Sequence, residues 1–541
     1  MGNETEMITH ATSHNGAQIQ FTDAAGCAHW IGLLPLTNVQ SAHQALMQQL
    51  QLVRQAGIAP AELLRILEAL REPIHYVQGE MARKYTAKPL PLDTSESTAW
   101  LRVLGLWQEL IDGYLACRDA RAQGGPALPG DGALIVQRCL RYTANVMFEH
   151  YRIYRQIPAG MWVKLHRLYA FAEQGGFART PVADSVNEQR VESSCCAAYG
   201  QALLAHMANP FALSGRQLGF LACWIEKWSA LLSLAAQPLP PCAIPPIGVD
   251  LAGNTGPTFG ENLAVTSNLR HLDLEQISLT LRQTIGSLKQ GQTPASLGLG
   301  EDARQPGCEN LLMLLYIQLC RAGTGRGEQR ASAQVKAQVC LGTHAAHYFV
   351  GGRAFRVPGA RLSRREEHDM QLFGHISERT EQALASGQSS AVESWDIVNQ
   401  SNSGFLCMLR ESDAQLRISH NQLVAVRRSS SKMFYLGVVQ WLRGEEGGDL
   451  RVGVRLFPGI ARAVAARPAN FKAPAGEHGY DRALLLPEIA VPATPATLIL
   501  PLGWYQPGRF VEIVGEQKQV AKLVNVIEKG SDFDRCTVTL A

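Results

Sequence analysis

Hydrophobic residues recur every three or four positions over most of the first 240 residues, which is the period of a helix that buries one face. Leu46 and Leu50 begin this spacing, and the segment from Val39 to Gln237 continues it. We therefore predict an N-terminal helical domain over residues 1–240, with a short β or irregular segment at 1–38. Individual helices are expected at residues 97–119, 133–154, 159–174, 183–208 and 214–235.

A proline-rich segment interrupts the helical pattern after residue 237. Five prolines lie between Pro238 and Pro246. They stop any helix there, because proline lacks a backbone donor and fixes φ. Two further helices are indicated near residues 274–289 and 309–321. Residues 241–325 are therefore predicted to be a linker with connecting helices.

From about residue 326 the pattern changes to an alternation of apolar and polar residues, which is typical of strands. Residues 333–341 form the first such run. We expect a β-rich domain over residues 326–470, followed by a β-rich extension over residues 471–541. The strands of the extension either continue the preceding domain or form a subdomain beside it; they are expected at residues 497–502, 509–514, 520–527 and 536–540.

One strand ends in a turn whose residues suit a small polar ligand. Side chains alternate along residues 393–400, which places Trp395, Ile397 and Asn399 on one face. The strand then breaks into Ser401-Asn-Ser-Gly404, residues that favour turns. Asn399 and Ser401 should project from the same face, and Gly404 lets another group approach the backbone. The same residues also fit an ordinary hairpin turn.

The spacing Asn399-x-Ser401-x-x-Gly404 resembles the second signature of PilZ domains, the bacterial six-stranded β-barrels that bind cyclic di-GMP. The first signature of that family is Arg-x-x-x-Arg, placed just before the first barrel strand. Arg326 and Arg330 are similar to it, because they directly precede the first strand-like run. The resemblance implies that these five residues contact the ligand.

The end of this region also resembles the family. Residues 434–441 and 449–457 form two strand-like runs around a charged, Gly-rich turn. The resemblance implies a PilZ-like antiparallel β-barrel over residues 326–470. The expected fold class is thus multidomain α+β, an N-terminal all-α helical array followed by a C-terminal PilZ-like antiparallel β-barrel.

The chain departs from the family in the distance between the two signatures, because 68 residues lie between Arg330 and Asn399. Ser363 with Glu366 three residues later is a capping-box pattern, and it predicts a helical insertion at about residues 361–388. This insertion holds a second Arg-x-x-x-Arg at Arg361 and Arg365. We favour Arg326 and Arg330, since they lie on a Gly-rich approach to a strand, whereas the other pair straddles a helix start.

Cyclic di-GMP carries two phosphates and two guanines, and an arginine can bind either one through a forked pair of donors. The resemblance implies that Arg326 and Arg330 clamp phosphate and base edges. Asn399 and Ser401 would add hydrogen bonds, and Gly404 would leave room. Arg427 and Arg428 either extend a basic ligand surface or are ordinary exposed arginines.

The composition is that of a globular protein, with 46% apolar and 18% charged residues. A net charge of +3 over 541 residues does not support a dedicated nucleic-acid binder. The 12 cysteines show no metal-binding spacing, which favours reduced thiols in a cytoplasmic protein. No stretch is long and apolar enough to predict a membrane span, and the first residues do not resemble a signal peptide.

Catalytic motifs are absent from the sequence: there is no HExxH, no P-loop and no Gly-x-Ser-x-Gly. His344 and His347 fall in a strand-like stretch, which would place them on opposite faces and argues against a shared metal. The sequence therefore does not predict an enzyme.

Two hypotheses remain open. In the first, the protein is a cytoplasmic cyclic di-GMP receptor whose barrel senses the dinucleotide and whose helical domain transmits to a protein partner. In the second, it is a helical adaptor whose degenerate barrel binds no nucleotide. The 68-residue separation favours the second hypothesis, and the two signatures favour the first.

Overall fold

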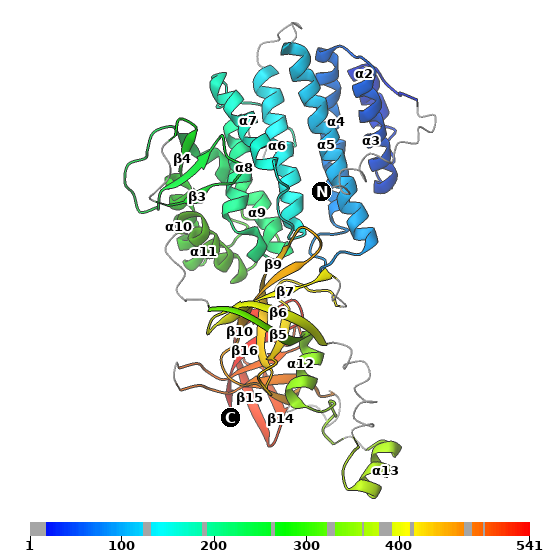
Figure 1. Ribbon diagram of the computed structural model, residues 1–541, viewed down its shortest axis with the longest axis vertical. Helices are drawn as coiled ribbons and strands as arrows, with labels where there is room; N and C mark the ends of the chain where they lie inside the picture. Colours follow the sequence, from blue (N-terminus) through cyan, green and yellow to red (C-terminus); the bar gives the residue numbers. More distant parts are fainter. Residues whose placement is uncertain are drawn as a thin grey trace.

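The computed structural model describes residues 18–122, 131–186, 192–260, 266–321, 331–359, 362–377, 392–411, 416–469, 479–490 and 493–540. A helical domain, a first β-barrel and a second β-barrel follow one another along the long axis of the molecule (Figure 1). The expectation of a helical N-terminal part followed by a C-terminal β-barrel is confirmed, and the chain carries two barrels in place of one.

The helical domain begins with eight α-helices in the part of the chain that the structure describes. They are α2 (Ala24–Ile31), α3 (Val39–Gln55), α4 (Pro60–Ala82), α5 (Thr94–Ala122), α6 (Asp131–Arg152), α7 (Met161–Gln174), α8 (Cys195–Met207) and α9 (Gly215–Trp228). Side chains cap several of the starts; at α9, for example, Ser214 and Gln217 form a capping box. Helix α2 replaces part of the irregular segment expected at residues 1–38.

Two predicted helices are shorter than the sequence pattern suggested. The helix expected at residues 183–208 begins only at Cys195, because Val182 and Ser193 pair as a β-bridge and Ser194 caps the helix. The helix expected at residues 214–235 ends at Trp228 and gives way to a 3-10 turn and to strand β1 (Ser233–Ala235). After Trp228 the apolar run continues through residues 229–235, so periodicity alone did not mark that boundary.

The described residues of the predicted linker, 241–260 and 266–321, are part of the helical domain. Its strands β2 (Ile247–Asp250), β3 (Thr258–Phe259) and β4 (Leu269–Asp273) join β1 in a four-stranded antiparallel sheet of order β1-β4-β2-β3. Helices α10 (Glu275–Lys289) and α11 (Gly307–Cys320) follow. One hydrophobic core runs from Phe21 to Cys320, so the helical domain extends well beyond residue 240.

The first barrel is closed and antiparallel, with strand order β10-β7-β6-β5-β8-β9. Its strands are β5 (Ala331–Leu341), β6 (Val392–Gln400), β7 (Gly404–Leu409), β8 (Leu423–Arg428), β9 (Tyr435–Gly444) and β10 (Leu450–Leu456). Trp395, Ile397, Cys407 and Val452 are among the residues that fill its interior.

The insertion between β5 and β6 differs in part from the prediction. Helix α13 (Arg364–Phe373) has the predicted capping box of Ser363 and Glu366, but it ends at Gly374, whose φ of +69° terminates it. Residues 378–391 lie outside the described residues. A second helix, α12 (Gly342–Gly351), follows β5 directly, so His344 and His347 lie on a helix and the prediction of a strand there was wrong.

The second barrel is also closed, with strand order β11-β12-β13-β16-β15-β14. Its strands are β11 (Arg462–Pro468), β12 (Asp481–Leu486), β13 (Thr497–Leu500), β14 (Phe510–Val514), β15 (Lys518–Lys529) and β16 (Asp534–Leu540). The expected boundary at residue 470 is therefore displaced, because β11 pairs with β12 and β14 and not with the first barrel.

The helical domain contributes to the interior of the first barrel. Leu90 and Tyr154 belong to the same buried cluster as the barrel residues. Leu90 also exchanges two backbone hydrogen bonds with Ile418, at 2.8 and 2.7 Å. The Tyr154 ring stacks on His420 with 6.1 Å between the ring centroids, and its carbonyl accepts from the Gly444 N–H at 2.8 Å. These contacts join the domains through buried surface.

The two barrels meet through a third buried cluster, which includes Leu423 and Phe457 from the first barrel or its flank and Phe533 from the second. Helix α12 packs between them, and His347 Nε2 lies 3.1 Å from the Val464 carbonyl oxygen. Asp532 accepts a hydrogen bond from the Leu423 N–H at 2.9 Å.

Candidate ligand site at the end of the first barrel

The turn between β6 and β7 lies at one end of the first barrel, called here the β6–β7 end. The Ser401 N–H donates to the Gly404 carbonyl at 2.9 Å, and Gln400 pairs with Phe405 directly before the turn. The hydroxyl oxygens of Ser401 and Ser403 are 3.3 Å apart. The structure therefore places Asn399, Ser401 and Gly404 on one tight hairpin.

A β-bulge changes the face on which Asn399 lies. Trp395 and Ile397 are 0% and 1% exposed, as the alternation predicted. The register then shifts, so that Ile397 pairs with Cys407 whereas Asn399 pairs with Leu406. Cys407 and Phe405 belong to the barrel core, so Leu406 and its partner Asn399 face outward. The prediction that Asn399 shares a face with Trp395 and Ile397 was therefore wrong.

Gly404 is required by the packing of the barrel itself. A Cβ atom at this position would lie 2.2 Å from the carbonyl oxygen of Val454 on the neighbouring strand β10. The group that approaches the glycine is thus a backbone carbonyl. This contact explains the residue independently of any ligand.

Arg326 and Arg330 lie outside the described residues. The described chain resumes at Ala331, which pairs with Gln400, and Ser332 pairs with Asn399. The β5 strand therefore starts directly beside the turn. In the alternative motif, Arg361 is also outside the described residues, and Arg365 lies on α13, which stands apart from β6 and β7 (Figure 1).

Arg428, at the end of β8, also reaches the β6–β7 end. Its Nη1 donates to Gln400 Oε1 at 3.1 Å, and its guanidinium carbon lies 5.8 Å from the centroid of the Phe405 ring. The buried Nε has no hydrogen-bond partner among the residues that the structure describes. The neighbouring Arg427 differs, because its Nε donates to Gln338 at 3.0 Å and its guanidinium lies over Phe434. Neither arginine is fully exposed.

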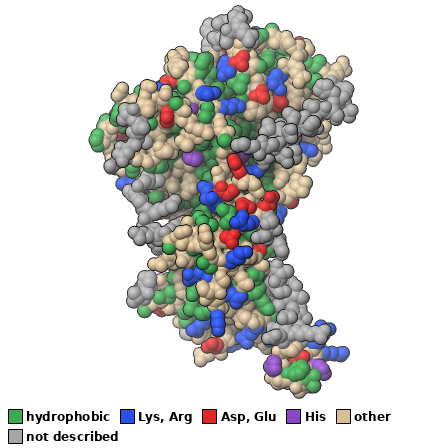
Figure 2. All heavy atoms as spheres, in the orientation of Figure 1, with side chains coloured by type: hydrophobic (Ala, Val, Ile, Leu, Met, Phe, Trp, Pro, Cys, Tyr) green, Lys and Arg blue, Asp and Glu red, His purple; other side chains and the backbone are tan. Residues whose placement is uncertain are grey.

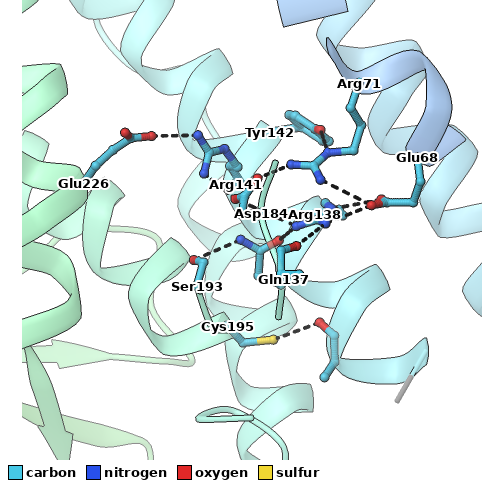
Figure 3. A network of polar contacts seen from close by, with 12 residues as sticks. Glu68, Arg71, Gln137, Arg138, Arg141, Tyr142, Asp184, Ser193, Cys195 and Glu226 are labelled. Carbon is cyan, nitrogen blue, oxygen red and sulfur yellow. Dashed lines mark hydrogen bonds and ion pairs between the residues drawn. The ribbon is translucent and has the colours of Figure 1, made fainter. Parts of the chain in front are cut away.

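A second concentration of charge lies inside the helical domain (Figure 3). Asp184 accepts from Arg71 and from Arg141, the latter at 2.5 Å. Glu68 binds Arg138 through two hydrogen bonds of 2.9 Å, and Glu226 accepts from Arg141 at 2.6 Å. Three cations thus face three anions, so the network carries no excess charge for a ligand.

Two carboxylates of this network, Asp184 and Glu68, stay ionised at neutral pH because their pKa values are lowered. Burial alone would raise the pKa of Asp184, but Arg141, Arg71 and Arg138 together hold that pKa below its ordinary value. Burial also opposes ionisation of Glu68, and Arg138 and Arg71 again lower its pKa. The network therefore acts as a set of ion pairs that joins α4, α6, α9 and the segment before residue 187.

Within the described residues, no group of three or more His, Cys, Asp and Glu side chains could hold a metal ion. In the same part of the chain, the helices are all too short or too polar to cross a bilayer. All twelve cysteines lie within the described residues, and ten of them are buried.

Comparison with known proteins gives two matches to family models. Residues 24–239 match the model described as "Cyclic-di-GMP receptor FimW, N-terminal domain". Residues 464–541 match the "FimW C-terminal beta-barrel domain". The first range covers most of the helical domain and the second covers nearly all of the second barrel. The first barrel lies between the two matched ranges.

A relative from Pseudomonas aeruginosa, the "Cyclic-di-GMP receptor FimW", aligns along almost the whole chain. The two proteins are 26% identical over 552 aligned positions, which cover 92% of this chain and 87% of the relative. These findings support a relationship to a cyclic di-GMP receptor family.

Proposed function

We propose that this protein is a cytoplasmic receptor for cyclic di-GMP, and that the first barrel is PilZ-like and holds the dinucleotide at its β6–β7 end. The name of the Pseudomonas relative and the descriptions of the two matched models support the ligand. The observation that carries the placement of the site is the pairing of Ala331 with Gln400. The residue that follows Arg330 is thereby adjacent to the Asn399–Gly404 turn.

The chemistry of the site follows from the resemblance between its two signatures and those of PilZ domains. Arg326 and Arg330 bind phosphate oxygens and guanine edges, for which forked donors are suited. Ser401 contributes a hydroxyl group at the turn, and Asn399 a side-chain amide on the outer face of the barrel. The helical domain transmits the bound state to a protein partner, and no catalysis is involved.

Calorimetric titration of the full chain with cyclic di-GMP tests this function. A good bidentate contact between arginine and guanine is worth about 1–3 kcal/mol, and 1.4 kcal/mol corresponds to a factor of ten. Replacing both Arg326 and Arg330 by Ala should therefore raise the Kd by at least about tenfold. Arg462→Ala, at an exposed arginine that begins the second barrel, is the matched control and should leave the Kd unchanged.

Two outcomes would contradict the proposal. If the wild-type protein gave neither heat of binding nor thermal shift with cyclic di-GMP, the adaptor with a degenerate barrel would be the better description. If the wild type bound but the double variant bound equally well, the ligand would occupy another part of the molecule.

A further inference from the structure

At the β6–β7 end, the guanidinium of Arg428 makes only part of the hydrogen bonds that it could make. Arg428 contacts the two residues that flank the turn, Gln400 directly before Ser401 and Phe405 directly after Gly404. Strand β8, which carries Arg428, is separated from β6 by β5 in the sheet order. The side chain therefore reaches past β5 to the turn.

The contacts of Arg428 leave one edge of its guanidinium without a described partner. Gln400 occupies Nη1, and Nε is buried without a partner among the described residues. A buried donor that makes no hydrogen bond costs roughly 1–3 kcal/mol, so native structures rarely leave one unexplained. Nε and Nη2 form the edge with which arginine binds a pair of acceptors.

We propose that Arg428 is a third arginine of the ligand site and that its Nε–Nη2 edge binds two acceptor atoms of the dinucleotide. This inference rests on the proposed function. The acceptors are either two phosphate oxygens or O6 and N7 of one guanine, because both present a pair of acceptors to a planar fork. Gln400 and Phe405 act as positioning residues: the amide holds Nη1 and the ring supports the guanidinium.

Arg427 provides a matched control on the neighbouring position of the same strand. Its guanidinium is occupied by Gln338 and lies over Phe434, and neither of these residues belongs to the turn. The two arginines have the same charge and similar partial burial. If these arginines affected binding only through their charge, replacing either one would raise the Kd by a similar factor. If Arg428 contacts the ligand directly, replacing Arg428 should raise the Kd much more than replacing Arg427.

The test is a cyclic di-GMP titration of the full chain with Arg428→Met and Arg427→Met. Methionine keeps an apolar side chain over Phe405 but removes every donor, so Arg428→Met should fold and should raise the Kd by about tenfold or more. Arg427→Met should stay within about twofold of the wild type. Arg428→Lys keeps a cation near Phe405 but loses the fork, and it should also weaken binding.

Thermal unfolding without ligand separates a binding role from a purely structural one. If Arg428 only stabilised the barrel, Arg428→Met would lower the Tm while Arg428→Lys kept wild-type affinity, and the inference would be overturned. The inference would also be overturned if Arg428→Met bound cyclic di-GMP like the wild type while the Arg326/Arg330 variant did not. The proposed function would then stand, but without a role for Arg428. If the wild type did not bind cyclic di-GMP, both the proposed function and the role of Arg428 would be contradicted.

An analogue of cyclic di-GMP that carries 7-deazaguanine distinguishes the two kinds of acceptor. If Arg428 binds a guanine edge, the wild type should bind this analogue more weakly than cyclic di-GMP, and Arg428→Met should bind both alike. If Arg428 binds phosphate, loss of N7 should change the affinity of wild type and variant by the same factor.

Discussion

Within the motif formed by Asn399, Ser401 and Gly404, the glycine is required by the fold of the barrel, whereas the two polar residues are proposed to bind the ligand. The spacing of Asn399, Ser401 and Gly404 could be read from the sequence, but the neighbour of the glycine could not. That neighbour is the Val454 carbonyl oxygen, 50 residues further along the chain, and only the pairing of β7 with β10 brings it close. The motif therefore serves the fold of the barrel as well as the proposed ligand.

Replacing Gly404 by Ala should destabilise the first barrel. The added Cβ would lie 2.2 Å from the Val454 carbonyl oxygen, so the two strands must move apart. Overpacking of this kind costs about 1–3 kcal/mol. Thermal unfolding should show a lower Tm for Gly404→Ala. Ser401→Ala is the control: it should keep the wild-type Tm and weaken only cyclic di-GMP binding. A wild-type Tm for Gly404→Ala would contradict this interpretation.

Arg428 illustrates why part of the proposed site was not predictable from the sequence. The sequence shows two adjacent arginines, and it left open whether they form a ligand surface or are simply exposed. Arg428 meets Gln400 and Phe405 because β5 lies between β8 and β6 in the sheet, an order that depends on pairings between segments far apart in the chain. The sequence signal was the adjacent pair itself, without any indication of its neighbours in space.

At the scale of helices and strands, long periodic segments were predicted well and short ones were not. Helix α6 was expected at residues 133–154 and spans Asp131–Arg152, because its pattern repeats over six turns. Strands β2, β3 and β4 have two to five residues, too few for any period to show. Strands β11 and β12 were also missed, and with them the closure of the second barrel, because their buried residues are consecutive and do not alternate with exposed ones.

The ion-pair network of Figure 3 links helices α4, α6 and α9 through buried charged groups, in addition to their apolar contacts. Asp184 is 4% exposed and accepts from Arg71 on α4 and Arg141 on α6. Removing one member of a buried pair leaves an uncompensated charge, which costs about 3–5 kcal/mol.

Asp184→Ala should therefore lower the stability of the helical domain by about 3–5 kcal/mol. Urea unfolding followed by far-UV circular dichroism measures this loss. Arg65→Ala is a suitable control, since Arg65 pairs with Glu62 at 2.6 Å but its side chain is 64% exposed. Exposed pairs contribute about 0–1 kcal/mol. Equal losses in the two variants would show that the network contributes no more than a surface pair.

At the scale of the whole molecule, Asp532 makes the junction of the two barrels sensitive to pH. Burial raises the pKa of this carboxyl to about 6, and the hydrogen bond from the Leu423 N–H opposes the rise only in part. Within the described residues, Oδ2 is buried without a partner. An acid with a raised pKa stabilises the fold in its protonated form. Its contribution is therefore present below the ordinary carboxyl pKa near 4 and is lost as pH rises through about 6.

Asp532→Asn should remove this pH dependence, because the amide stays neutral at every pH. A shift of two pKa units corresponds to about 3 kcal/mol, so the variant should gain up to about that much over the wild type between pH 4 and pH 7. Buried histidines such as His347 and His420, whose pKa values burial lowers to about 4, act in the opposite direction in both proteins. The measurement is thus the difference in Tm between variant and wild type across that range. A difference in Tm that does not change with pH would contradict a raised pKa for Asp532.

The shared interior of the first barrel and the helical domain also has an evolutionary consequence. Leu90 and Tyr154 fill space that the barrel strands leave open, and Leu423 and Phe457 are buried partly by the second barrel. Recombination that transferred the first barrel to another gene would expose these apolar surfaces to water. We expect the three parts to be inherited together as one cassette, with changes at Leu90 or Tyr154 accompanied by compensating changes in the strands that they touch.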